Sequence, residues 1–536
     1  MWKKHRRILQ IMSVMCLVLC TGCQSNQEEI FSESAETSSQ PSNGETSEIV
    51  IPEVDYDSPN YIGPDESELQ DLDPVENDTL SGELLIKRSF ADENINFLAQ
   101  EFMQLHPDVK ISFEEAVSDA EIMKLSKKEI RIKRENYFSR MRMELASGEA
   151  DYLILDMRDG LDPVQLLKSG LLLDLQPYFG NDPEIDQEEY FSQILEAYSV
   201  DGKLPTIPMS VMYNAVYLNR PLLEENGIDL SDIVTVTTQD LLDWYEVART
   251  SEYDLNLFFT SPGKDALFST ERVAYMDLTQ KTARFDSPEF VKFLEGTAAT
   301  ENSDPELSYE NWEIGLMDSG LFNEQIRLRE TGKLEEKYFG PPGSYGYEQY
   351  GGIAQKSRSA MAALEPVVHP TLLYLEQPME YVAGPYPLLS SDGKLGLLSR
   401  EEFAIPSSCE NPDLAWEFIK YCIGPREKDR IDFAHFGWPT LYTTDLPLSK
   451  TNLYYHLQDL VENGNTGGIV NYQFEPFDRD SIMDKVNEIF SLPLVNLNSY
   501  GVDVQEYLDE FYVNELTTAE QCAEKIQGRA EIWLNE

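Results

Sequence analysis

Carboxylates, rather than histidines or thiols, are the reactive side chains that this sequence offers in quantity. Its 536 residues include 96 Asp and Glu but only 5 His and 6 Cys. Beyond residue 23 the chain contains no Gly-x-Ser-x-Gly elbow, no His-Glu-x-x-His helix and no Cys-x-x-Cys pair. No histidine in that stretch has a second one at the spacing of a helical metal site. We therefore expect neither triad nor zinc chemistry, and we assign no catalytic residue, metal or cofactor.

Paired carboxylates could still act as acid and base in the hydrolysis of a glycan. With 96 acids in the chain, however, close pairs arise without any functional reason. The acidic stretch Asp71–Asp78 lacks the spacing and the glycine of an EF-hand, so it does not predict a calcium site. An exported glycan hydrolase remains an open alternative to a protein that only binds its ligand.

Binding of a sugar requires aromatic rings for its CH faces and carboxylates or amides for its hydroxyls. The apolar run Tyr152–Leu155 predicts a buried strand that ends at Asp156, in a turn that contains Arg158. The carboxyl ends of strands in open α/β sheets face the ligand crevice, so both residues are candidates for ligand binding. The alternatives are that Asp156 caps the next turn and that Arg158 forms a salt bridge with a neighbouring aspartate.

A strand-helix-strand pattern near residue 84 sets the expected fold class. Leu84 and Ile86 alternate with polar residues, residues 95–105 repeat apolar positions at helical spacing, and residues 109–113 alternate again. Two strands joined by such a helix run parallel with a right-handed crossover. The sequence therefore predicts an α/β sheet flanked by helices, and the turns after Lys87 and Leu155 are candidate ligand loops.

Length and charge narrow the class of protein. A chain of 536 residues is too long for one core and predicts at least two lobes. With 42 basic and 96 acidic residues, the net charge of −54 repels phosphate backbones, so nucleic acid is not an expected partner.

The first residues predict export. A basic start precedes an apolar stretch from Ile8 to Leu19, which spans only about 18 Å as a helix and is too short for a permanent membrane anchor. The ending Thr21-Gly22-Cys23 resembles a bacterial lipobox, which implies removal of residues 1–22 and lipid, such as palmitate, on Cys23. Simple secretion is the alternative, because Cys20 stands where that pattern favours Leu.

The residues from Cys23 to Ser81 contain no Lys or Arg and are rich in Ser, Glu, Asp, Asn and Pro. Such a composition predicts a disordered acidic tether, 23–81, and favours a Gram-positive type of cell surface. Among the later cysteines, a helix from residue 411 to 422 separates Cys409 and Cys422 by about 15 Å, too far for a disulfide. Unpaired cysteines are expected, with a bond from Cys522 to either one left open.

Several motifs in a fixed order resemble the family 1 extracellular solute-binding proteins of ABC importers, the maltose-binding-protein-like family. The resemblance covers about residues 83 to 536, and each motif is weak alone. The motifs are Phe102–Val109, Leu145–Glu149, Ser169–Leu175, Asp201–Gly227, Asp286–Phe290, Ser359–Met361, Asn411–Lys420, Phe436–Pro439 and Thr517–Glu536.

The resemblance implies a two-lobed, type II periplasmic-binding-protein-like α/β fold with crossing hinge strands. The N-terminal lobe would comprise 83–208 and 365–400, and the C-terminal lobe 214–356 and 408–536. The chain would cross between the lobes at 205–213, 357–364 and 401–407. A ligand that contacts both lobes would stabilise the closed state.

The same resemblance implies the remaining candidate ligand residues. Trp438, in a Gly-Trp-Pro turn at the family's cleft-facing position, is the best single candidate, with packing at the lobe edge as its alternative. Tyr213 and Asn214 would lie at the first crossing, where core packing is the alternative for the tyrosine, and Glu365 just past the second, where it could be solvated. Two further aromatic residues could line the rim or simply pack: Trp312 and Tyr386.

The expected function is therefore that of a lipid-anchored extracellular protein that captures a small ligand and delivers it to an ABC permease. It would be a monomer without enzymatic activity, held at the outer face of the cell membrane through Cys23. An oligosaccharide is the expected ligand, and sugar phosphates and peptides stay open. A sensor that reports ligand occupancy to a membrane signalling protein would need the same closing cleft.

Overall fold

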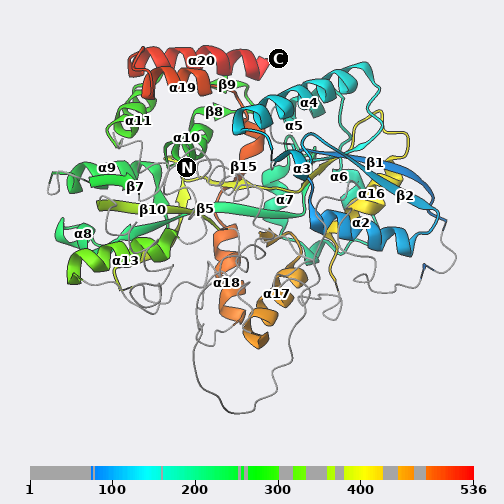
Figure 1. Ribbon diagram of the computed structural model, residues 1–536, viewed down its shortest axis with the longest axis horizontal. Coiled ribbons are helices and arrows are strands. Elements are labelled where there is room, and N and C mark those ends of the chain that lie inside the picture. Colours follow the sequence, from blue (N-terminus) through cyan, green and yellow to red (C-terminus); the bar gives the residue numbers. More distant parts are fainter. Residues whose placement is uncertain are drawn as a thin grey trace, which may run out of the picture.

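The computed structural model is a mixed α/β protein built on two sheets (Figure 1). It describes residues 74–75, 79–122, 124–157, 161–250, 255–258, 263–300, 318–332, 359–367, 380–426, 445–463 and 479–535. The predicted fold class is confirmed: each sheet is covered by helices, and the chain passes from one sheet to the other. None of the helices in these ranges has the length and apolar character needed to span a bilayer.

The smaller sheet has the strand order β2-β1-β3-β13-β4. Its strands are β1 (Gly82–Arg88), β2 (Val109–Glu115), β3 (Leu153–Leu155), β4 (Ile207–Pro208) and β13 (Glu402–Ala404). Strand β1 is parallel to both β2 and β3, while β13 is antiparallel to β3 and β4. The helix α2 (Glu93–Leu105) connects β1 and β2, which confirms the predicted strand-helix-strand unit.

Helices cover the smaller sheet because their apolar faces complete its core. Asp92 caps the start of α2 by accepting from the Ile95 amide, and α16 packs beside α2 and β1. Ser126 and Glu129 form a capping box that begins α4, and Gly148 ends it in the left-handed region with φ 74°. The helices of this part are α3 (Asp119–Ile122), α4 (Lys127–Ser147), α5 (Pro163–Lys168), α6 (Gln176–Asn181), η1 (Gln187–Glu189), α7 (Ser192–Tyr198) and α16 (Pro412–Ile423).

The larger sheet is built around the long strand β5 (Ser210–Asn219) and has the order β15-β12-β11-β5-β10-β7, with β14 on β5 and β6 on β11. Its other strands are β6 (Val236–Thr237), β7 (Leu255–Phe258), β10 (Ser359–Val367), β11 (Val382–Leu389), β12 (Leu395–Leu398), β14 (Leu446–Pro447) and β15 (Leu494–Asn496). A short hairpin pairs β8 (Met276–Asp277) with β9 (Thr282–Ala283).

Helices on the larger sheet enclose a second core, and the C-terminal helix α20 lies along one side of the molecule (Figure 1). Thr518 and Gln521 exchange hydrogen bonds and form a capping box at the start of α20. The helices are α8 (Arg220–Glu225), α9 (Thr238–Ala248), α10 (Gly263–Glu271), η2 (Arg272–Tyr275), α11 (Pro288–Ala298), α13 (Asp318–Thr331), η6 (Leu497–Tyr500), α19 (Gln505–Tyr512) and α20 (Ala519–Asn535). The buried apolar residues of α17 (Lys450–Asn463) and α18 (Arg479–Phe490) instead join the core that contains the smaller sheet.

Within the described residues, two passages of the chain join the sheets directly, and they lie side by side. The first runs from β4 into β5 and the second from β12 into β13. The Met209 amide in the first donates to the Glu401 carbonyl in the second at 2.9 Å. We refer to the parts on either side as the small-sheet half and the large-sheet half. The first passage falls in the predicted crossing 205–213, and the second begins just before the predicted crossing 401–407.

Other segments lie differently from the domain ranges that the resemblance implies. Most of the expected crossing 357–364 belongs to β10, which pairs with β5 and β7 inside the larger sheet. Strands β11 and β12, within the range 365–400 expected in the N-terminal lobe, also pair with β5. Helix α16, from the range 408–536, packs on the smaller sheet. The physical reason is that strand pairing and helix docking are decided by contacts distant in sequence.

Unpaired cysteines, the default expectation, are confirmed. Cys409, Cys422 and Cys522 are all free thiols, so neither bond that was left open for Cys522 forms. Burial raises the pKa of the Cys522 thiol to about 12, and the thiol donates to the Tyr507 carbonyl. These cysteines therefore act as core residues.

Candidate functional site at the junction of the two sheets

The carboxyl edge of the smaller sheet meets the second passage at Asp156 and Glu402. The Asp156 amide donates to the Glu402 carbonyl at 3.0 Å, and both residues are buried. Asp156 has a φ of 93°, a backbone conformation that costs energy in any residue other than glycine. Such strain gathers at functional sites, which makes this edge the candidate site.

Glu402 ties the two halves together through a buried carboxylate. It accepts from Thr206 Oγ1 at 2.5 Å in the small-sheet half, and from Asn496 Nδ2 at 3.3 Å and Asn498 Nδ2 at 2.5 Å in the large-sheet half. Burial raises the pKa of Glu402, the three donors oppose that shift, and the charge of Asp156 adds to it. Because its donors come from both halves, Glu402 is a sensitive point for any change in their relative position.

Two more titratable groups are enclosed near Glu402. Burial, and then the charges of Glu402 and Asp445, hold the pKa of Tyr198 well above its usual value. The Asp445 side chain is fully buried and lies 3.7 Å from Arg400 Nε. The junction therefore gathers buried acidic groups, and burial favours the protonated forms of Glu402 and Tyr198.

The carboxylate of Glu401, the residue before Glu402, also holds the second passage to the first. Ser210 Oγ, at the start of β5, donates to Glu401 Oε2 at 3.2 Å, and Ser399 Oγ donates to the Glu401 carbonyl at 2.9 Å. The carboxylates of Glu401 and Glu402 thus hold the second passage to the first through different partners, Ser210 and Thr206.

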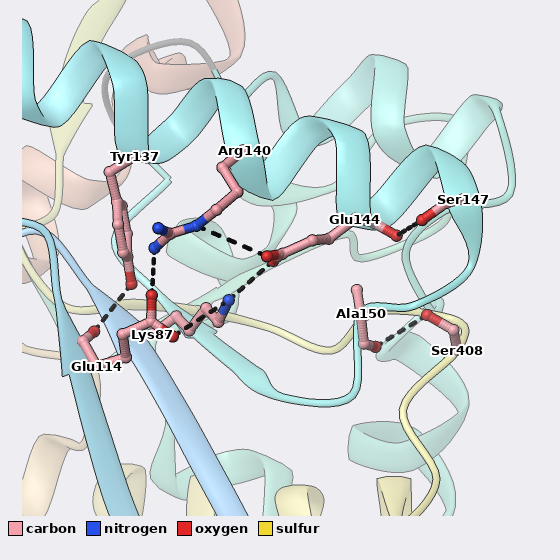
Figure 2. Close-up of polar contacts among 8 residues, drawn as sticks. All are labelled: Lys87, Glu114, Tyr137, Arg140, Glu144, Ser147, Ala150 and Ser408. Carbon is pink, nitrogen blue, oxygen red and sulfur yellow. Dashed lines mark hydrogen bonds and ion pairs between the residues drawn. The ribbon is translucent and has the colours of Figure 1, made fainter.

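The polar side chains at the end of β1 hold helix α4 instead of facing a ligand. Lys87 Nζ lies 2.8 Å from Glu144 and 3.4 Å from Glu114 (Figure 2). It also lies over the ring of Tyr152. Tyr137 donates to the Glu114 carbonyl at 2.9 Å from the same helix. This buried cation fixes α4 on the sheet, so the candidate ligand loop after β1 does not offer its lysine.

A seam between α5 and the large-sheet half lies next to the junction. Gln165 Nε2 donates to the Trp533 carbonyl of α20, and Lys168 Nζ donates to the Leu278 carbonyl at 3.1 Å. The hollow between them has a volume of about 50 Å³, which is large enough for water but too small for a sugar ring. Its lining residues are Asp162, Val164, Gln165, Lys168, Ser169, Leu278, Lys281, Trp533 and Leu534.

Asp162 places a carboxylate at this seam. Its Oδ1 accepts from the amides of Val164 at 2.9 Å and Gln165 at 3.1 Å and so caps α5. Its Oδ2 is enclosed without a hydrogen-bond partner. Burial raises the pKa of Asp162 to about 6, although the two amides and Lys168 act in the opposite direction.

A larger hollow of about 420 Å³ lies between α6 and α16 on the small-sheet half. Lys420 Nζ there contacts the carboxylates of Asp182, Glu184 and Glu417 within 3.2 Å, and Trp416 Nε1 donates to Asp182 at 2.9 Å. These groups satisfy one another, so the hollow offers no unpaired group to a ligand.

The sequence-derived candidates are dispersed rather than gathered. Asp156 lies at the junction, and Tyr213 is buried in the core on β5. Asn214 is half-buried opposite Pro366 on β10, and Glu365 pairs with Ala215. Tyr386, half-buried on β11, pairs with Val216, and burial raises its pKa. Four other named residues lie outside the described ranges: Cys23, Arg158, Trp312 and Trp438.

Sequence reasoning did not single out Glu402, Thr206, Asn498 or Asp162. The hinge interval 401–407 did include Glu402, but a glutamate in a strand usually points to solvent. The stretch Asp162-Pro163, with an acceptor before a proline, is a recognisable helix start and could have pointed to Asp162.

Comparison with known families gives one match, which covers part of the chain. Residues 91–314 match the family model described as bacterial extracellular solute-binding protein, which agrees with the resemblance over that part of the chain. No curated protein matches the sequence.

Solved structures of such proteins are similar over most of the chain. One is an ABC substrate-binding protein from Listeria monocytogenes in complex with cycloalternan, with 13% identity and a TM-score of 0.46 over 85% of this chain and 99% of that chain. Another is the sugar-binding protein MalE from Xanthomonas citri, with 12% identity and a TM-score of 0.46 over 85% and 98%.

Proposed function

We propose that this protein captures an oligosaccharide between its two halves and delivers it to an ABC importer, without chemical change to the sugar. The observation that carries the proposal is the match of residues 91–314 to extracellular solute-binding proteins. The arrangement of the two halves supports this function. Because they are joined by two adjacent passages, small changes of backbone conformation in those passages can open and close the space between the halves.

The junction supplies the means for closure to respond to a ligand. Glu402 has donors in both halves, and the seam between α5 and α20 forms only while the halves are together. A ligand that touches both halves would add contacts to the closed arrangement alone and shift the population toward it.

Attachment at the cell surface belongs to the same proposal. Lipid on Cys23 and an acidic tether over 23–81 would hold the protein at the outer face of the membrane, where the permease works. The candidates Trp438, Arg158 and Trp312 would contribute ring faces and hydrogen bonds to the sugar, beside Asp156.

A thermal-shift screen of the purified protein tests the proposal. At least one di- to tetrasaccharide should raise the melting temperature, because a ligand that binds only the folded state stabilises it by mass action. If short peptides raise the melting temperature and sugars do not, the ligand is a peptide and not an oligosaccharide. Release of products from any glycoside in the same samples would favour the hydrolase.

Trp438 provides a point test of the site. If its ring stacks on the sugar, Trp438→Ala should weaken binding by about 1–3 kcal/mol, measured by titration calorimetry with the sugar found in the screen. Trp244→Ala on α9 is the matched control, since that ring packs against the core of the large-sheet half. Equal affinity of both variants would remove Trp438 from the binding site.

A further inference from the structure

Helix α4 and the residues just before it carry an unusual share of the chain's positive charge. Residues 124–142 contain eight Lys and Arg but only two Glu, in a chain that has 42 basic and 96 acidic residues. The helix lies at the outer edge of the molecule, at the upper right in Figure 1. A local excess of cations in so acidic a protein indicates an anionic partner, because the net charge elsewhere repels one.

One side of α4 packs into the core, and the opposite side meets solvent. The packed side includes Phe138, Met141 and Leu145, which are buried at helical spacing. Ile132 and Met143 lie opposite them and are 42% and 66% exposed. The two side chains are about three turns apart and therefore almost aligned along the helix. The solvent side of α4 thus carries exposed apolar groups as well as charge.

Exposed cations flank these two apolar side chains. Lys128, Arg131 and Arg142 are all exposed, and helical spacing places each of them within about 100° of Ile132 around the axis. We define the outer face of α4 by these five residues: Lys128, Arg131, Ile132, Arg142 and Met143. Apolar side chains set among Lys and Arg on one helix face are typical of helices that lie at the surface of an anionic membrane.

Acids next to the outer face offset only part of its charge. Glu129 accepts from Ser126 in the capping box, and Glu135 lies 3.5 Å from Arg131 Nε. The pair of Glu135 with Arg131 is mostly exposed and therefore weak, so an anionic headgroup can replace it. Lys124, just before the helix, is exposed and adds a further cation. Two other cations of α4 pair with acids of neighbouring elements or of the helix itself: Lys133 with Glu121, and Arg140 with Glu114 and Glu144.

We propose that the outer face of α4 binds the surface of a membrane that contains anionic lipids. The inference goes beyond ligand capture and does not depend on it. Charges more than about 8 Å apart are largely screened at physiological ionic strength, so acids elsewhere on the protein oppose this contact only weakly. Ile132 and Met143 favour a bilayer over an acidic protein segment, because a bilayer offers an apolar layer just beneath its charged surface.

Co-sedimentation with vesicles tests the proposal. The protein is the chain without residues 1–22 and without lipid on Cys23, since either would bind vesicles by itself. It should bind vesicles of equal parts phosphatidylglycerol and phosphatidylcholine, bind phosphatidylcholine vesicles much more weakly, and lose this difference at high salt. Equal binding to both kinds of vesicle, or binding to neither, would overturn the proposal.

A triple variant locates the contact on α4. Lys128→Gln, Arg131→Gln and Arg142→Gln together should lower partition into the anionic vesicles about 100-fold, since each basic residue near such a surface contributes about five-fold. The substituted side chains are exposed, and circular dichroism checks that the variant folds. The matched control replaces three exposed lysines elsewhere by glutamine: Lys110, Lys203 and Lys292. It should partition like the unchanged protein, and equal losses in the two variants would contradict a contact through α4.

The two apolar side chains distinguish a bilayer from an acidic protein segment as the occupant of the outer face. Ile132→Gln combined with Met143→Gln should weaken binding to the anionic vesicles about 10-fold, because these side chains lose an apolar environment. Binding of a polyglutamate peptide should be weak and unchanged by this substitution. If the double variant binds vesicles like the unchanged protein and polyglutamate displaces them, the outer face fits an acidic protein segment, such as residues 23–81, and the proposal is wrong.

Discussion

At the scale of single residues, the carboxyl group of Asp162 at the seam should make the free energy of unfolding depend on pH. Its pKa is about 6 in the folded protein and near 3.8 when exposed, so the folded state binds the proton more tightly. The free energy of unfolding should therefore fall as pH rises from about 4 to about 6, and above that window the buried charge costs up to about 3 kcal/mol.

Asp162→Asn should remove this cost, because the amide still caps α5 and carries no charge. Urea unfolding at pH 5 and pH 7.5 should show a gain in stability at the higher pH and a smaller difference between the two. Asp92→Asn, at the cap of α2, is the control. A pH dependence that survives in Asp162→Asn would assign it to another group.

Residue-scale chemistry was the least predictable part of the molecule. Glu402 lies 196 residues from Thr206 and 96 from Asn498, so no local pattern reveals that its carboxylate is enclosed. Arg272 reads like any surface arginine beside Glu271, and only the fold shows that the two do not pair. Asp156 could be anticipated, because it ends a short apolar strand and the carboxyl ends of such strands face one edge.

At the scale of elements, α4 depends on one lysine beneath it. Lys87→Met should destabilise the protein by about 1–3 kcal/mol, because Glu144 and Glu114 lose their partly buried cation. Urea unfolding measures the change. Lys110→Met on the neighbouring strand removes an exposed pair with Glu83 and should cost less than about 1 kcal/mol. Equal effects of both substitutions would contradict the role given to Lys87.

Elements with strong local patterns were predicted well. The apolar repeat of α2, the proline and cap of α16 and the box at Thr518 are each contained in a short stretch of sequence. The placing of β11 and β12 was not predictable in this way. Their partner β5 lies about 170 residues earlier, and their apolar faces would suit either sheet.

At the scale of the whole molecule, the seam bears on the balance between separated and closed halves. The double substitution Gln165→Ala and Lys168→Ala removes both side-chain contacts across it. Ligand affinity should fall about 5- to 30-fold, since these bonds favour the closed arrangement. Titration calorimetry with the ligand from the screen measures the effect, and Lys203→Ala, an exposed lysine of the same half, is the control. Tighter binding by the double variant would show that the seam opposes closure.

The direction of β1 determines where the preceding chain departs. The strand starts at Gly82, where Asn411 Nδ2 donates to the Ser81 carbonyl, and it runs toward the edge that carries Asp156. Anything joined to the chain ahead of residue 81 is thus attached at the back of the small-sheet half. Immobilising the protein on a sensor chip by that end would leave the front open to sugars in the flowing buffer, while a fluorophore placed there would report tumbling without obstructing capture.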